Sequence, residues 1–376
     1  NDGPSIVQEG LKYVHNDACY PAILVIGQFM DALHSGKYDI NRTALIITQT
    51  GGGCRASNYI HMLRKALHRA GMDQVPVISL NLSGLESNPG FQIDLDMIRK
   101  LLAGVVYGDT LMCLNNQIKP YEIQKGQSEA LLNTWTDRLN DQLNHGHGIG
   151  MSAQKKNLRL ILHDFAQIPI KKVPKVHVGI VGEIYVKYAA FANNHLEDFL
   201  AEQDCEVNVP GLMNFLIFMV GHSLDDIHLY GGNPAKLILV KALFQYVTAM
   251  QHTITNAFKP YPQFLAPTEF AHVKELVKGV IGYGAKMGEG WLLTAEMLEL
   301  AECGFENIIC AQPFGCLPNH IVGKGMVHKL KQVDPNSNIV PIDYDPSATK
   351  VNQENRIKLM LAVARENLKK KNTYAK

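Results

Sequence analysis

Two kinds of hydrophobic pattern alternate along this chain. Short runs of apolar and β-branched residues, bounded by glycine, proline or polar residues, are typical of buried strands. Longer stretches with apolar residues three or four positions apart are typical of amphipathic helices. On this basis we predict strands at residues 45–48, 75–80, 206–210 and 339–345, a strand and its exit at 176–186, and a strand beginning near 306.

The predicted helices fall between these strands, which indicates parallel α/β units. They are expected after Pro21, from Tyr59 to the stop at Gly71, over much of 91–166, and at 191–203, 237–258, 270–280, 291–301 and 351–370.

The strand–helix–strand plan starts again after a segment around Pro169 and Pro174 that also carries three lysines, the best domain boundary in the chain. We therefore predict an α/β protein with two Rossmann-like or flavodoxin-like parallel-sheet domains and additional helices. The N-terminal domain would cover residues 1–168 and the C-terminal domain residues 169–376.

The charge balance narrows the possible partners. The 376 residues include 36 Lys and Arg and 35 Asp and Glu. A nucleic-acid or membrane-surface protein is usually basic, so neither partner is expected. No apolar run reaches the roughly 18 residues of a membrane span, and no signal-peptide pattern opens the sequence. We expect a cytoplasmic protein.

The seven cysteines are odd in number and contain no close C-x-x-C pair. A disulfide framework is therefore not expected, and zinc-ribbon and bacterial ferredoxin spacings are absent. Any metal site has to be assembled from distant parts of the chain.

The stretch from Ala44 to Ser57, A-L-I-I-T-Q-T-G-G-G-C-R-A-S, carries the clearest chemical signal. A predicted strand breaks at three glycines, and Cys54 then stands directly ahead of a predicted helix. Free amides and the helix dipole at a helix start favour a thiolate over a thiol. Arg55 adds a positive charge, and glycines such as Gly53 let the backbone approach whatever the sulfur holds.

The same local setting recurs at Cys19, ahead of Pro21, and at Cys316, ahead of Pro318. In parallel sheets such positions gather at the carboxyl ends of the strands. Three thiolates meeting there would need a metal centre to balance their charge. An iron–sulfur cluster fits, zinc with three thiolates and a water fits as well, and three unrelated buried thiols remain the plain alternative.

Several longer motifs around these cysteines resemble a known family. N-D-A-C-Y-P-A, T-Q-T-G-G-G-C-R-A-S-N-Y and Q-P-F-G-C-L-P-N-H-I, with G-E-G-W-L-L-T-A-E at residues 288–296, resemble the C-terminal module of large acyl-CoA dehydratase activase-related proteins. These proteins are relatives of the 2-hydroxyacyl-CoA dehydratases and the double-cubane-cluster proteins. The resemblance extends over nearly the whole chain.

The resemblance implies an oxygen-sensitive iron–sulfur protein of anaerobes that transfers electrons. Its metal ligands would be Cys19, Cys54 and Cys316, with Arg55 and Gly53 beside the cofactor. The cofactor would be a 4Fe–4S cluster or half of a double-cubane 8Fe–9S cluster. The larger cluster needs more thiolates, which an upstream module or partner chain would supply.

The resemblance also implies a partner, an ATP-hydrolysing activator that carries its own iron–sulfur cluster, and an oligomeric assembly. This chain has no Walker-type G-x-x-x-x-G-K-[S/T], so ATP hydrolysis is not assigned to it. The expected function is that of a reductase or 2-hydroxyacyl-CoA dehydratase-like component, an oxidoreductase acting on a small or CoA-linked substrate.

Two alternatives stay open. The chain would be a non-catalytic scaffold or docking module of a larger complex if its cysteines are structural or zinc-bound. A cysteine-nucleophile hydrolase needs a histidine beside Cys54, and His61, two turns along the predicted helix, is a poor candidate for that base.

Overall fold

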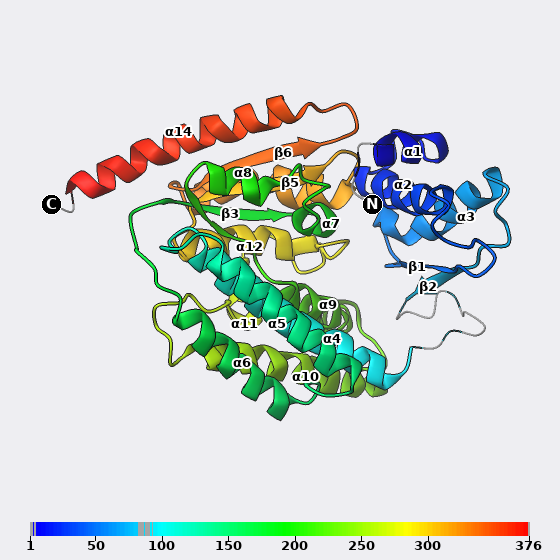
Figure 1. Ribbon diagram of the computed structural model, residues 1–376, viewed down its shortest axis with the longest axis horizontal. Helices are drawn as coiled ribbons and strands as arrows, with labels where there is room; N and C mark the ends of the chain where they lie inside the picture. Colours follow the sequence, from blue (N-terminus) through cyan, green and yellow to red (C-terminus); the bar gives the residue numbers. More distant parts are fainter. Residues whose placement is uncertain (1–2, 4, 82–85, 87–90, 92, 375–376) are drawn as a thin grey trace.

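The computed structural model describes residues 3, 5–81, 86, 91 and 93–374. Within them the chain is a mixed α/β protein with parallel sheets, which confirms the predicted class (Figure 1). A small sheet pairs β1 (Leu45–Thr48) with β2 (Val77–Leu80). A larger sheet has the order β4-β3-β5-β6, with β3 at Val176–Gly182, β4 at Cys205–Asn208, β5 at Asn307–Pro313 and β6 at Asn338–Tyr344.

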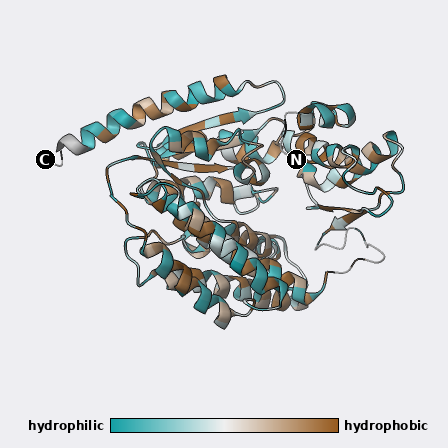
Figure 2. Ribbon diagram, in the orientation of Figure 1, coloured by the Kyte–Doolittle hydropathy of each residue, from teal (hydrophilic) through white to brown (hydrophobic). Residues whose placement is uncertain are grey.

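The larger sheet is covered on both faces, because successive side chains of a strand point to opposite sides. On β5, Ile309 and Ala311 join the core beneath α14 (Lys350–Tyr374), α7 (Ile184–Tyr188) and α8 (Leu196–Glu202). Ile308 and Cys310 pack on the other face, in the core that includes α12 (Gly290–Glu302). Figure 2 shows hydrophilic and hydrophobic residues alternating along α14, and Val351, Leu359 and Val363 are exposed on it.

A layer of helices lies beyond α12 (Figure 1). It contains α4 (Leu95–Ile118), α5 (Gln127–Asn144) and α6 (Met151–Ala166), together with α9 (Leu212–Tyr230), α10 (Pro234–Phe258) and α11 (Phe270–Leu276). These helices share one hydrophobic core. That core takes residues from both sides of the predicted boundary at 168/169, which itself stays a prediction.

A small lobe carries the first part of the chain: α1 (Ser5–Tyr13), α2 (Tyr20–His34), β1, the short turn η1 (Arg55–Asn58), α3 (Tyr59–Arg69) and β2. Helices α1 and α2 cross at very short range. A Cβ at Gly10 would lie 2.1 Å from the carbonyl oxygen of Ile23, and one at Gly27 would lie 2.2 Å from that of Ile6. Only glycine permits this approach.

The structure differs from the predicted helices in several places, and the helix predicted at 270–280 ends at Leu276. The predicted helix at 191–203 is wrong at its start, because α8 begins at Leu196, after Asn194 and His195 with φ of 57° and 58°. Helices α1 and α9 were not predicted. Past β5 the chain forms the π-helical turn η2 (Asn319–Gly323), then η3 (Lys324–Met326) and α13 (Val327–Val333).

No helix in the described part of the chain combines the length and the apolar character that a membrane crossing requires.

The connections of the larger sheet define where a ligand would bind. From β3 the chain passes to its neighbour β4 on one side, and then to β5 and β6 on the other. The order therefore reverses between β3 and β5, and such a switch point leaves a crevice at the carboxyl ends of the strands. The small lobe faces this edge of the sheet (Figure 1).

Candidate cysteine site

The loops that carry Cys19 and Cys316 lie against each other. The Tyr20 amide donates to the Phe314 carbonyl oxygen at 2.9 Å. Gly315 has φ of +73°, and a Cβ on it would lie 3.1 Å from the Cα of Cys19. The loop after β5 thus reaches the start of α2 only because residue 315 is glycine.

The Cys54 loop is joined to the same region through the turn before α12. The Gly53 amide donates to the Met287 sulfur at 3.1 Å. A Cβ on Gly288, at φ +62°, would lie 3.1 Å from the Pro318 ring. The 287–290 turn therefore touches the Cys54 loop on one side and the segment after Cys316 on the other.

The three candidate cysteines are close enough to interact electrostatically. The pKa of Cys54 is raised to about 11, mainly by burial, and the negative charges of Glu289 and Cys19 contribute to that rise. Burial also raises the pKa of Cys316, and the charge of Cys19 again contributes. The fold thus brings these three sulfurs to one region. No group of three or more His, Cys, Asp or Glu among the described residues is arranged to hold a single metal ion as it stands.

Each of the three sulfurs stands at a helical start, as predicted. Cys19 precedes α2, Cys54 precedes η1, and the Cys316 carbonyl oxygen accepts a hydrogen bond from the His320 amide in the first turn after it. Cys19 and Cys54 make no capping hydrogen bond of normal geometry. Nearby backbone amides nevertheless act to lower the thiol pKa values. The Ala22 amide lowers that of Cys19, the Ala56 amide that of Cys54 and the Asn319 amide that of Cys316.

Burial outweighs that amide effect, so the net pKa of each thiol is raised rather than lowered. The prediction that these cysteines favour the thiolate is therefore wrong for the net pKa, although the amides do act in the predicted direction. The reason is that Cys19 and Cys316 are only 4% and 7% exposed, and a buried thiolate loses its hydration. Thiolates here need a positive partner.

Arg55 and Tyr59 connect the Cys54 segment to Cys19. The guanidinium of Arg55 donates to the Asp17 carbonyl oxygen at 2.7 Å, and its charge lowers the pKa of Cys19. The Tyr59 hydroxyl lies 2.8 Å from the Cys19 sulfur. Arg55 thus adds positive charge near the cysteines. The sequence placed this charge beside Cys54, whereas in the structure it lowers the pKa of Cys19.

Two carboxyls, the buried Glu289 and the half-buried Glu183, stand at the sheet edge near the cysteines. Glu183 directly follows β3, and its Oε2 accepts from the Val186 amide at 2.9 Å. Glu289 accepts from the Ile184 amide at 2.9 Å and from Asn319 Nδ2 at 3.3 Å. Burial raises the pKa of both, and their mutual repulsion raises that of Glu183 further. Both carboxyls raise the pKa values of Cys54 and Cys316.

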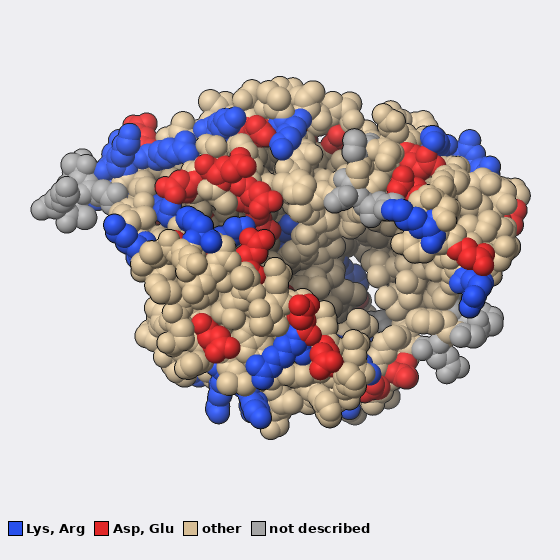
Figure 3. Space-filling view, in the orientation of Figure 1, with Lys and Arg blue, Asp and Glu red and all other residues tan. Residues whose placement is uncertain are grey.

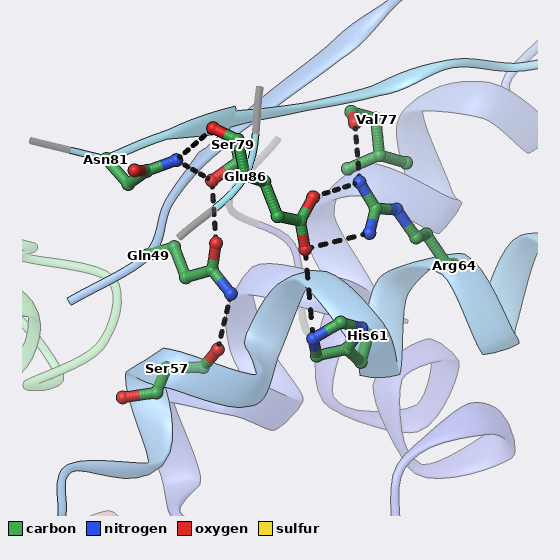
Figure 4. A network of polar contacts seen from close by, with 8 residues as sticks. All are labelled: Gln49, Ser57, His61, Arg64, Val77, Ser79, Asn81 and Glu86. Atoms are coloured by element: carbon green, nitrogen blue, oxygen red, sulfur yellow. Dashed lines mark hydrogen bonds and ion pairs between the residues drawn. The ribbon is translucent and has the colours of Figure 1, made fainter. Parts of the chain in front are cut away.

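A polar network holds the Cys54 helix start on the ends of β1 and β2 (Figure 4). Gln49 donates to the Ser57 carbonyl oxygen at 3.2 Å and accepts from the Ser79 hydroxyl at 2.7 Å. Glu86 accepts two hydrogen bonds from Arg64, at 2.7 and 3.1 Å. Gln49, at the start of the loop before Cys54, is thereby joined to η1 and to β2.

The same network gives His61 a partner other than Cys54. His61 Nε2 lies 3.8 Å from Glu86 Oε1, and its side chain is 58% exposed. Figure 4 shows its ring turned toward Glu86. This placement agrees with the expectation that His61 is a poor base for Cys54.

Exposed apolar side chains surround the segment that carries Cys316: Phe314, Leu317 and Ile321, together with Met287 in the turn before α12. Figure 3 shows a hollow between the small lobe and the rest of the molecule, with walls that are largely uncharged in this view. The surroundings of the cysteines are thus apolar at the surface and acidic underneath.

Sequence reasoning missed Tyr59, Glu183, Met287 and Glu289. A signal existed for Glu289, because Gly288 and Gly290 flank it: a Cβ on Gly290, at φ +52°, would lie 2.5 Å from the Ala285 carbonyl oxygen. Such a pair of glycines marks a turn with a required geometry. No comparable local signal marks Glu183 or Tyr59.

No protein-family model, curated protein or solved structure matches this chain.

Proposed function

We propose that this chain is the cluster-bearing component of an ATP-dependent reductase or 2-hydroxyacyl-CoA dehydratase-like system. The observation that carries the proposal is the convergence of Cys19, Cys54 and Cys316, from three distant segments, at the switch point of a parallel sheet. On this proposal the chain has two Rossmann-like or flavodoxin-like units, one around the larger sheet and one around the β1–β2 sheet of the small lobe.

The donor set fits a thiolate-ligated iron–sulfur cluster. Cys19, Cys54 and Cys316 would be the ligands of a 4Fe–4S cluster, or of half an 8Fe–9S cluster whose other thiolates come from an upstream module. A cluster places its ligand sulfurs further apart than one metal ion does, so the lack of a single-ion geometry is compatible with it. When bound, the cluster would supply one-electron reduction at an iron without a protein ligand.

The residues around the sulfurs have separate parts in this proposal. The helix-start amides and Arg55 offset negative charge, and the Tyr59 hydroxyl donates toward the Cys19 sulfur. The apolar side chains around Cys316 keep water away from the site. Electrons would come from an ATP-hydrolysing activator with its own cluster, and the substrate would be small or CoA-linked.

Anaerobic reconstitution with iron and sulfide tests the proposal. We expect iron and acid-labile sulfide in comparable amounts per chain, and an iron–sulfur signal by EPR or Mössbauer spectroscopy. Cys54→Ala should lose most of that iron. Cys205→Ala is the matched control, because Cys205 is also buried but starts β4, away from the three loops. Full iron content in Cys54→Ala would contradict the proposal.

A second candidate is a docking module with structural or zinc-bound cysteines. The tip of the α9–α10 hairpin favours it, because Leu229, Tyr230, Ile238 and Leu239 are 50–73% exposed there. Exposed apolar groups gathered at one tip are typical of contact surfaces. Zinc without acid-labile sulfide in protein purified without oxygen would favour this candidate over the first.

A further inference from the structure

The first half of α10 is unusually apolar for a helix at the surface. Residues 237–244 read L-I-L-V-K-A-L-F, with Lys241 as the only polar side chain. Ile238 and Leu239 are both 71% exposed, and Leu243 is 46% exposed. A helix that is apolar on nearly every side is normally buried. This half of α10 is therefore expected to be covered when the protein is assembled.

The end of α9 extends the same apolar surface. Leu229 and Tyr230 are 50% and 73% exposed, and they directly precede the turn into α10. The turn is ordered, because the Asn233 side chain caps the start of α10. One turn further back, Asp225 pairs with Lys274 at 2.5 Å and holds α9 against α11. The α9–α10 tip is thus a structured apolar surface and not a frayed end.

A hollow of about 730 Å³ lies elsewhere on the molecule, between α4 and α5. Gly104 and Gly108, one turn apart on α4, form part of its wall. Beyond the helix's own backbone, a Cβ added at either would meet no atom of the described residues within 4 Å. Most of the remaining lining is apolar, and includes Met97, Leu101, Val105, Met112, Leu143 and Leu212. This α4–α5 hollow has the volume and the lining of a binding site.

The charges around the tip and around the hollow are opposite in sign. Helix α10 has Lys236 and Lys241 in its first half and no acidic residue along its whole length. Helix α5 has three acids and one arginine. Two of those acids, Asp137 and Asp141, are exposed and lie three residues before the hollow-lining Asn140 and Asn144, so they stand beside its rim. An apolar centre with rim charges of opposite sign is typical of protein interfaces.

We propose that the α9–α10 tip of one copy packs into the α4–α5 hollow of a second copy of this chain. Both surfaces belong to the same chain, so two copies can make the contact twice, each tip in the other's hollow. Such a reciprocal pair is a closed two-fold dimer, the commonest kind of soluble oligomer. The dimer buries the apolar half of α10 and fills the hollow at once. It involves none of the cysteine ligands, so it does not rest on the proposed function.

Sedimentation equilibrium of the iron-free, full-length chain over a dilution series tests the tip. We expect a dimer for the parent protein and at least about tenfold weaker dimerisation for Ile238→Glu, because a charge would enter an apolar contact. Leu359→Glu is the matched control. Leu359, on α14, is also 71% exposed, so its variant adds the same charge to another surface and should dimerise like the parent.

A second pair of variants tests the hollow. Gly104→Leu places a side chain in the hollow without meeting another described segment, and should weaken dimerisation about as much as Ile238→Glu. Gly104→Ala improves the helix propensity in the same direction but leaves most of the volume open, so its effect should be smaller. Circular dichroism and the urea midpoint of each variant show whether it is folded.

Mixing the two weakened variants tests whether tip and hollow bind each other. Ile238→Glu keeps an intact hollow and Gly104→Leu keeps an intact tip, so the mixture can form one of the two contacts. We expect a tagged copy of one variant to retain the other more strongly than either retains itself. A monomeric parent would overturn the proposal and assign the tip to a different protein. Parent-like dimerisation of Gly104→Leu would also overturn it, because tips packed against tips do not need the hollow.

Discussion

The Met287 sulfur accepts the backbone N–H of Gly53 at 3.1 Å, across 234 positions of sequence. This contact joins the turn before α12 to the loop that presents Cys54. Because the next residue, Gly288, packs on Pro318 after Cys316, a single turn holds two of the three cysteine segments together.

Gly52→Ala should disturb this junction. Gly52 has φ of +72°, and its Cβ would lie 2.9 Å from the Met287 sulfur. We expect a loss of about 1–3 kcal/mol in unfolding free energy, measured by urea denaturation, together with reduced iron content after reconstitution.

Two further glycine variants separate the cost of a positive φ from the cost of the close contact with Met287. Gly36→Ala has a similar φ of +69° but open space around its Cβ, so it should cost less than Gly52→Ala. Gly53→Ala places its Cβ at an ordinary 3.5 Å from Met287 and should be nearly neutral. Equal losses in all three would show that the Met287 contact has no effect.

Tyr59→Phe should change the properties of the site while leaving it assembled. It removes the hydroxyl that lies 2.8 Å from the Cys19 sulfur. We expect a loss of about 1 kcal/mol in unfolding free energy and, in reconstituted protein, full iron content with a lower reduction potential, because hydrogen bonds to sulfur stabilise the reduced cluster. Potentiometric EPR titration measures this, and an unchanged potential would exclude a role for the hydroxyl.

Asp109 should make stability depend on pH in a defined window. Its carboxyl accepts from the Leu212 and Met213 amides at the start of α9, but burial raises its pKa to about 6. A raised carboxyl pKa means that the folded state binds more protons, so stability falls as pH rises from about 4 through 6. Relative to Asp109→Asn, the parent should lose about 3 kcal/mol across that window.

Urea denaturation of both proteins at closely spaced pH values gives the difference directly. A difference that stays constant with pH would mean that Asp109 titrates normally.

Lys187→Met should be among the most destabilising single changes. Lys187 Nζ lies 3.2 Å from Glu296 Oε2, and both side chains are buried. Burial acts to lower the pKa of Lys187, but Glu296, Tyr188 and Glu289 together outweigh it and the net pKa is raised. Removing the cation leaves Glu296 unpaired, which we expect to cost about 3–5 kcal/mol. The double variant Lys187→Met/Glu296→Leu should recover much of this loss.

The exposed pair Lys278 and Glu275, at 3.4 Å, provides the comparison. Lys278→Met should change stability by less than about 1 kcal/mol. Thermal or urea unfolding of the three variants would reveal whether burial makes the difference.

The elements that local pattern dictates were predictable. Apolar β-branched runs marked the strands from β1 to β6 to within a few residues, and Gly and Pro marked the helix starts behind Cys19, Cys54 and Cys316. Helix α9 escaped prediction, and the polar turn at Asn194 and His195, where φ is positive, was mistaken for helix. Short-range signals fail where tertiary contacts select the backbone conformation.

By itself the sequence determined the parallel α/β class and the placement of the three cysteines at helix starts, because both depend on residues a few positions apart. Only the tertiary structure decided that those cysteines lie near one another, that Glu183 and Glu289 stand near them, and that Glu296 of α12 is buried against Lys187. These relationships depend on strand order and on packing between segments hundreds of residues apart, and no periodicity within one segment encodes which surfaces will meet.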